Sequence, residues 1–249
     1  MNEKVAVLDH GYLQLVESWG SDERIIESAR MSTGRGFLGW GPMPCPTCAH
    51  GQPCRACNST GEVAGDEKLL RFLWENKHAT PFEMAGLTIE IQAPIFVFRE
   101  WHRHRTQSYS ELSARYTPIP DVNYIPSIER LMLNAVGANK QAGTVRDAGV
   151  LTEAKAETFR TSLQGIYATA EGLYQEALLA GVPKELARIH LPVGRYSRMR
   201  ASANLRNWLA FLTLRMDSKA QLEIRMYANE VGNVIARTFP RTWELFAKR

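Results

Sequence analysis

Residues 99–116 read REWHRHRTQSYSELSARY and carry four arginines and two histidines against two glutamates. A guanidinium group stays charged at physiological pH, and its five N–H donors match phosphate or carboxylate oxygens in pairs. The simplest alternative is a solvated basic face. Against it, the apolar residues 95–98 precede the stretch and the turn-forming residues 117–120 follow it. We therefore expect these cations to lie inside a folded core and to bind an anion.

The order of residues within this stretch is informative beyond its charge. The relevant residues are Arg103, His104, Arg105, Ser108, Glu111, Leu112, Ser113, Arg115 and Tyr116. Their spacing resembles the signature of the flavin-dependent thymidylate synthases, written RHR, a short gap, and NE-x-S-x-RY. Ser110 stands where that family usually has asparagine, and Glu100 stands where it usually has glutamine.

Three further segments resemble motifs of the same family, in the same order along the chain. They are HATPFE at residues 78–83, ELARIHLP at residues 185–192 and LRMDSKAQLEI at residues 214–224. A single histidine such as His78 is more often a hydrogen-bonded structural residue than a ligand. The match over all six residues favours a flavin contact instead.

The resemblance implies two sets of binding residues. The dUMP set is Glu100, Arg103, Glu111, Ser113, Ala114, Arg115, Arg188 and Arg215. The FAD set is Ser32, His78, Thr80, Glu83, Arg103, His104, Arg105, Glu111, Asn204 and Arg206. The chain has neither G-x-G-x-x-G nor G-x-x-x-x-G-K-[ST], so side-chain donors such as His104 and Arg105 are expected to hold the flavin phosphates.

Catalytic roles are implied for Arg215 and Ser113. Arg215 would stabilise negative charge that develops on the uracil ring. Ser113 is the obvious substitute for an enzyme cysteine, but a serine without an adjacent base is a poor nucleophile. We therefore expect Ser113 to anchor dUMP while hydride reaches a ring that is not covalently attached to the enzyme.

The implied reaction is the reductive methylation of dUMP to dTMP, by a methyltransferase of nucleotide biosynthesis. Methylenetetrahydrofolate would give the carbon, and NADPH would reduce FAD. The family assembles as a homotetramer with active sites at subunit interfaces. Two alternatives remain: a zinc-containing nucleic-acid-binding protein that stacks bases on aromatic residues, and a flavoprotein of different specificity. The net charge of only +4 disfavours the first, and we expect no nucleic-acid partner.

All four cysteines, Cys45, Cys48, Cys54 and Cys57, fall in one short segment as two C-x-x-C pairs separated by five residues. This pattern predicts a tetrahedral zinc site more than disulfides, with free thiols in a loop as the alternative. The segment belongs to residues 34–65, which are rich in Gly, Pro and Cys and which the family resemblance does not cover.

A chain of 249 residues with 45% hydrophobic content can bury a sizeable core. We expect one domain over residues 1–249, with an inserted Cys-rich loop at about 34–65. The predicted class is α+β, with mixed helices and a small, mainly antiparallel sheet. No apolar run reaches the length of a membrane helix and no signal peptide is evident, so a cytoplasmic protein without a membrane partner is expected.

Caps and periodicity predict the individual elements. Strands are expected at 5–8, 12–16, 87–91 and 193–203. Helices are expected at 22–30 with Ser21 as cap, from Asp66 to Lys77, from Pro94, at 128–135, from Thr152 to Gly181, at 184–190, at 205–216 with Asn204 as cap, and from a Ser218–Gln221 capping box to a final stop at Pro240.

Overall fold

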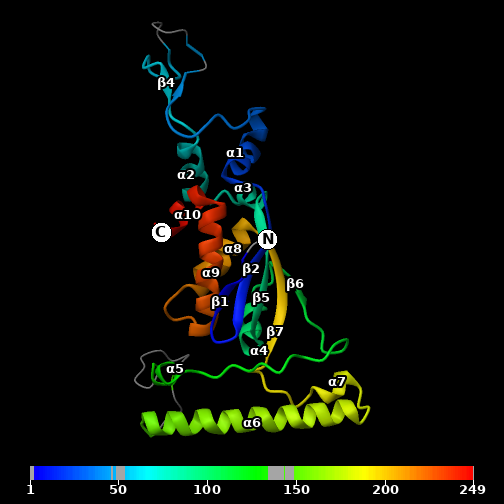
Figure 1. Cartoon of the computed structure of the whole chain (residues 1–249). Coiled ribbons are helices and arrows are strands. Elements are labelled where there is room, and N and C mark those ends of the chain that lie inside the picture. The colour runs from blue at the N-terminus through cyan, green and yellow to red at the C-terminus, as the bar shows by residue number, and fades with distance from the viewer. Residues whose placement is uncertain (1–2, 46, 49–53, 134–142, 144–148, 249) are drawn as a thin grey trace. The chain divides into compact units, whose positions relative to one another are not determined.

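The computed structural model describes residues 3–45, 47–48, 54–133, 143 and 149–248 (Figure 1). Its strands are β1 Val5–Val7, β2 Gly11–Trp19, β3 Met43–Pro44, β4 Glu62–Val63, β5 Gly86–Pro94, β6 Ser108–Glu111 and β7 Tyr196–Asn204. Its helices are α1 Asp22–Arg30, η1 Met31–Thr33, α2 Glu67–Glu75, α3 Ala79–Glu83, α4 Ile95–Trp101, α5 Ile128–Met132, α6 Glu153–Leu179, α7 Lys184–Ala187, α8 Leu205–Arg215, α9 Leu222–Thr238 and α10 Pro240–Ala247. The predicted α+β class is confirmed.

The main sheet has five strands in the order β1-β2-β5-β7-β6, and β3 and β4 form a separate antiparallel pair. β1 and β2 are antiparallel, with Val5 opposite Leu13. The strand β5 occupies the centre of the order, and its Leu87, Ile89 and Ile91 are fully buried. The alternation that predicted this strand is therefore confirmed.

The chain divides into two compact units. Unit 1 comprises Met1–Val16, Ile89–Ala201 and Phe211–Glu230, and unit 2 comprises Glu17–Thr88, Ser202–Ala210 and Val231–Arg249. In unit 1 the rings of Trp101 and Phe211 stack with centroids 4.7 Å apart. In unit 2 the indole N–H of Trp208 donates to the carbonyl of Leu87 at 3.0 Å. The single domain predicted for the whole chain stays a prediction.

The predicted caps at Ser21 and Asn204 are confirmed by hydrogen bonds, and Thr152 caps α6 in the same way. The hydroxyls of Ser21 and Thr152 accept the N–H groups of Arg24 and Lys155, and the Asn204 amide oxygen accepts the N–H of Asn207 at 2.9 Å. Each bond satisfies a backbone donor at the first turn of its helix. These interactions span three residues, which is why the sequence alone could predict them.

Asp66 does not cap α2 as predicted. Its carboxylate instead pairs with Arg30 and accepts the N–H of Leu38 at 2.8 Å. The carboxylate is buried, and an arginine partner offsets the cost of desolvating it better than one backbone N–H can. The predicted cap was therefore replaced by contacts between distant segments.

Other boundaries also differ from the prediction. Residues 79–83 form the short helix α3 rather than a plain turn, and α7 ends at Ala187 rather than at His190. α9 begins at Leu222, after the predicted Ser218–Gln221 box. Pro240 starts α10 instead of ending the helical chain, since its ring fits a first helical turn that needs no N–H. α5 ends at Met132, and residues 134–135 of the predicted helix lie outside the described residues.

The long helix α6 leaves several of its apolar side chains exposed. Its buried residues are Ala156, Tyr167 and Tyr174. Phe159 is 49% exposed, Ile166 60% and Leu173 52%. Among the described residues, no helix combines the length and apolar composition needed to cross a membrane.

Candidate functional site

The turn that follows α4 is fixed by its buried neighbours. The indole N–H of the buried Trp101 donates to the Gln107 side chain at 3.0 Å. The Tyr109 hydroxyl donates to the carbonyls of Trp101 at 3.1 Å and His104 at 2.7 Å. Residues 102–107 thus form a defined turn that begins inside the core of unit 1 and carries the RHR motif.

The arginines of the motif do not lie inside the core, contrary to the prediction. Arg103, Arg105 and Arg115 are exposed, as is Arg99. In α4 the buried residues are Val97, Phe98 and Trp101, so the apolar face fills the core and the charges remain in water. The reason is energetic, because burying an unpaired guanidinium costs far more than hydrating it. The helix also ends before Arg103, so Arg99 and Arg103 do not share a helical face.

Arg215, at the end of α8, is the most firmly held of the predicted site residues. Its guanidinium donates to the Glu100 carboxylate at 2.7 Å and to the Glu100 backbone carbonyl at 2.8 Å. Its Nε–H donates to Nε2 of His104 at 2.8 Å. These contacts engage three of the five N–H donors, which leaves two without a partner among the described residues. Glu100, at the family's glutamine position, therefore positions the arginine.

His104 is a neutral acceptor in this cluster. Burial, and then the nearby positive charge of Arg215, lower its pKa to about 4. Because the Nε–H of arginine can only donate, Nε2 of His104 must accept, and Nδ1 carries the remaining proton. His104 therefore offers one neutral N–H to a ligand, in contrast to the two cationic arginines beside it.

The segment after β6 reaches α7. The Arg115 Nε lies 3.2 Å from the Glu185 carboxylate, and the Lys184 ammonium donates to the Tyr116 carbonyl at 3.0 Å. Arg188 is the residue immediately after α7. The structure thus brings Ser113 and Arg115 to the helix that leads into Arg188.

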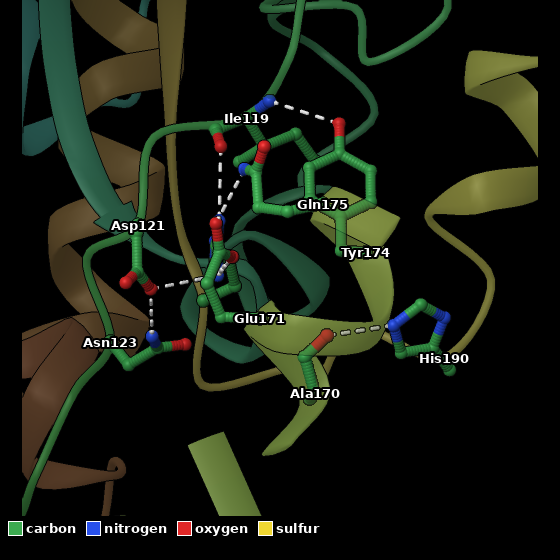
Figure 2. Close-up of polar contacts among 9 residues, drawn as sticks. Ile119, Asp121, Asn123, Ala170, Glu171, Tyr174, Gln175 and His190 are labelled. Carbon is green, nitrogen blue, oxygen red and sulfur yellow. Dashed lines mark hydrogen bonds and ion pairs between the residues drawn. The ribbon is translucent and has the colours of Figure 1, made fainter. Parts of the chain in front are cut away.

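The chain beyond Arg188 is anchored on α6, as Figure 2 shows. A His190 ring nitrogen donates to the carbonyl of Ala170 at 2.8 Å. Arg195 is fully buried and pairs with Glu171 at 2.7 Å and Asp121 at 3.0 Å. Arg195 was not among the predicted site residues, because an arginine at the start of a strand ordinarily points to water. The Arg195–Glu171 pair therefore ties the chain after Arg188 to the helix before it.

Unit 1 also has a groove beside its edge strand, with a volume of about 310 Å³. Its lining residues are Glu90, Ser110, Glu111, Leu112, Arg198, Met199 and Arg200. The Arg200 Nε donates to Glu90 at 3.1 Å. Arg198 and Arg200 were not predicted, although they alternate with the buried Met199 and Ala201 in β7, which is the pattern of one face turned outward.

Unit 2 holds the HATPFE segment. Pro81 and Phe82 of α3 are buried, whereas His78 and Thr80 are exposed. The His78 ring meets the ring of Phe72 edge-on at 5.5 Å. Glu83 accepts from Arg206 at 2.7 Å, so these two members of the predicted FAD set are in contact. Ser32 lies exposed in η1, where its hydroxyl donates to the Ala29 carbonyl.

The two predicted sets are distributed differently. All eight residues of the dUMP set belong to unit 1. The FAD set is divided, since unit 1 holds Arg103, His104, Arg105 and Glu111, and unit 2 holds the other six members. The dUMP set therefore lies within one unit, whereas the FAD set is divided between the two units.

The comparisons with known proteins agree on one family. A family model described as "Thymidylate synthase complementing protein" matches residues 14–241. A flavin-dependent thymidylate synthase of Thermosipho africanus is 35% identical over 97% of this chain and 93% of its own length. One from Thermus thermophilus is 33% identical over 97% of this chain and 77% of its own length.

A solved structure extends the likeness to the fold. The UMP/dUMP methylase PolB of Streptomyces cacaoi, bound with 5-Br dUMP, has a TM-score of 0.74 and 30% identity, over 98% of this chain and 97% of its own. The enzyme class is that of the flavin-dependent, methyl-transferring thymidylate synthases. This chain belongs to the flavin-dependent thymidylate synthase family, which confirms the resemblance seen in its motifs.

Proposed function

We propose that this enzyme methylates dUMP to dTMP, with methylenetetrahydrofolate as carbon donor and NADPH as the reductant of FAD. The observation that carries the proposal is the fixed guanidinium of Arg215, which keeps two N–H donors for a ligand. Arg215 lies in the same unit as the residues predicted to bind the dUMP phosphate. The names of the relatives and the 5-Br dUMP bound to PolB support dUMP as the substrate.

Arg215 is assigned to the uracil ring. Reduction of the ring places negative charge on its oxygen and nitrogen atoms, and a guanidinium that is already oriented stabilises that charge without reorganising. Glu100 and His104 supply this orientation through three hydrogen bonds. Because His104 is neutral, the positive charge of Arg215 is opposed only by Glu100 in this cluster.

The substrate phosphate is assigned to Arg115, Ser113 and Arg188. Arg115 now pairs with Glu185, and both side chains are more than half exposed. An exposed pair of this kind contributes only about 0–1 kcal/mol. A phosphate dianion forms stronger, charge-assisted hydrogen bonds, so it can displace Glu185 at little cost.

No enzyme nucleophile is assigned. All four cysteines belong to the inserted segment, where their Sγ atoms lie within 4.8 Å of one another and suit a shared metal ion. The Ser113 hydroxyl accepts the backbone N–H of Arg115, and among the described residues no histidine or carboxylate is hydrogen-bonded to it. Without such a base Ser113 is a substrate anchor, as predicted from the sequence.

The FAD set of unit 1 suits a diphosphate. Arg103 and Arg105 are exposed cations, and His104 adds a neutral donor. His78 and Thr80 add exposed polar groups from α3. Bound flavin supplies the redox chemistry, and the chain supplies binding and charge stabilisation.

A homotetramer is proposed on the exposed face of α6. Phe159, Ile166 and Leu173 recur at intervals of seven residues and are about half exposed or more. A helix with this period buries the row against another helix when one is available. Second copies of this chain are the proposed partners, with active sites completed at the interfaces. Light scattering on Ile166→Glu tests this, because the charge should dissociate the assembly.

The function is tested with purified protein, dUMP, methylenetetrahydrofolate and NADPH. We expect a flavin absorption spectrum that changes on addition of dUMP, and dTMP detected by mass spectrometry only when all three reactants are present. UMP serves as the comparison substrate. A protein that does not bind added FAD, or that makes no dTMP when loaded with flavin, contradicts the proposal.

A further inference from the structure

The four cysteines are brought together by a short hairpin. In it β3 pairs with β4, with Met43 opposite Val63, and the Cys45 N–H donates to the Gly61 carbonyl at 2.7 Å. We call residues 43–63 the cysteine tip, of which 46 and 49–53 lie outside the described residues. The hairpin explains how a gap of only five residues between the two C-x-x-C pairs still lets the pairs face each other.

The sulfur positions match a tetrahedral metal site. All four Sγ atoms lie within 4.8 Å of one another. Cys45 and Cys54 are 3.7 Å apart, and Cys48 and Cys57 are 3.6 Å apart. Zinc–sulfur bonds of about 2.3 Å in a tetrahedron place the sulfurs about 3.8 Å from each other. Each of these two short distances joins a cysteine of the first C-x-x-C pair to a cysteine of the second, as one ion bound by both pairs requires.

One hydroxyl lies close to two of these sulfurs. The Thr47 Oγ1 is 3.2 Å from Sγ of Cys45 and 3.5 Å from Sγ of Cys54. A hydroxyl at this distance can donate to a cysteine sulfur that is bound to a metal, so the first C-x-x-C turn also contacts a sulfur of the second pair.

The described residues of the tip form no apolar core. Of the described residues between 34 and 65, only Cys45 and Cys57 are buried. The root of the insertion is held differently, since Glu67 accepts the Gly41 N–H at 2.8 Å and the Trp40 indole donates to Glu23 at 2.6 Å. A segment that buries so little cannot offset its conformational entropy, unless a metal or a covalent bond closes it.

We propose that the cysteine tip binds one structural zinc ion through Cys45, Cys48, Cys54 and Cys57, and that this ion orders the tip while the side-chain contacts order the root. Four thiolates fill the tetrahedral shell and leave no position for a substrate. The ion therefore cross-links the tip as a structural metal and takes no part in dUMP chemistry.

Metal content is the first test. Protein purified under reducing conditions without chelator should contain one zinc ion per chain, measured by inductively coupled plasma mass spectrometry. The double variant Cys45→Ser/Cys57→Ser should contain none, and flavin content equal to the wild type shows that it has folded. The matched control is Arg55→Ser, which changes an exposed residue inside the second pair and should keep its zinc. Reduced protein without metal, or with an equimolar amount of iron, overturns the proposal.

Order of the tip is the second test. Arg55 is the one trypsin site between Arg35 and Lys68. Zinc-loaded wild-type protein should resist cleavage after Arg55, and chelator-treated protein should be cut there, with the fragments identified by mass spectrometry. Restored zinc should restore resistance. Equal cleavage with and without zinc would falsify the ordering role.

Discussion

The turn at residues 102–107 starts from Trp101, which is fully buried, whereas the cysteine tip starts from a two-residue strand and, among its described residues, buries only the thiols of Cys45 and Cys57. Both are irregular chain that holds chemically active side chains in place. The turn is ordered by hydrogen bonds that begin in the core, and the tip is ordered by a proposed metal. A segment close to a core can thus present exposed charges without an ion, while a segment far from one needs its own cross-link.

The largest expected effect follows from removing the support of the turn. Trp101→Ala deletes a buried ring that stacks on Phe211 and donates to Gln107. Substitutions of this kind cost about 3–5 kcal/mol of unfolding free energy. Urea denaturation of the two proteins measures the loss. A cost below about 1 kcal/mol would show that the turn does not depend on the core.

Arg215→Lys should lower kcat strongly, because lysine keeps the charge but cannot make the three contacts to Glu100 and His104. Loss of one oriented donor typically reduces kcat by about 10²–10³-fold. The KM for dUMP should change much less, since the phosphate is assigned elsewhere. Steady-state kinetics at saturating folate give both values, and an unchanged kcat rejects the assignment of Arg215.

Arg115→Ala tests the phosphate site. Loss of a charged hydrogen bond should weaken dUMP binding by about 1.5–3 kcal/mol, with flavin content unchanged. Calorimetric titration with dUMP is the measurement. Arg99→Ala is the matched control, because Arg99 is an exposed arginine of the same stretch with no assigned role. Equal affinities for the two variants contradict the assignment.

His104→Gln should change how stability depends on pH. The folded pKa of about 4 lies below the ordinary value of 6.5, so in between these values the unfolded chain binds more protons. This contribution to stability is complete above pH 6.5 and declines as the pH falls toward 4. Glutamine offers an oxygen to Arg215 and does not titrate, so the variant should lose less stability from pH 7 to pH 4.5. The measurement is the free energy of unfolding of both proteins, obtained by urea denaturation at pH 7 and at pH 4.5. An equal loss of stability in the variant and the wild type would exclude this role.

The smallest effect concerns turnover by the variant in which Cys45, Cys48, Cys54 and Cys57 are all serine. We expect the rate per flavin-loaded site to match the wild type, because no thiol is assigned to the chemistry. Mass spectrometry of quenched reactions provides a second readout, and it should find no dUMP attached to the protein. An adduct on Ser113 or on a wild-type cysteine would show that a nucleophile had been overlooked.

Motifs and local interactions were readable from the sequence. The spacing of RHR and of the residues up to Tyr116 identified the family, and the caps at Ser21 and Asn204 were confirmed. The alternation in β5 was confirmed as well. Each of these features depends on residues within a few positions of one another, so the order of the chain contains the necessary information.

Contacts between distant residues were decided only by the tertiary structure. Arg215 lies 115 residues from Glu100, Asp66 lies 36 from Arg30, and Arg195 lies 74 from Asp121. The tertiary structure also decided that α6 exposes Phe159, Ile166 and Leu173, and that the arginines of the RHR motif stay in water. Charged side chains and apolar faces choose among many possible partners, and burial selects one only when the whole chain has packed.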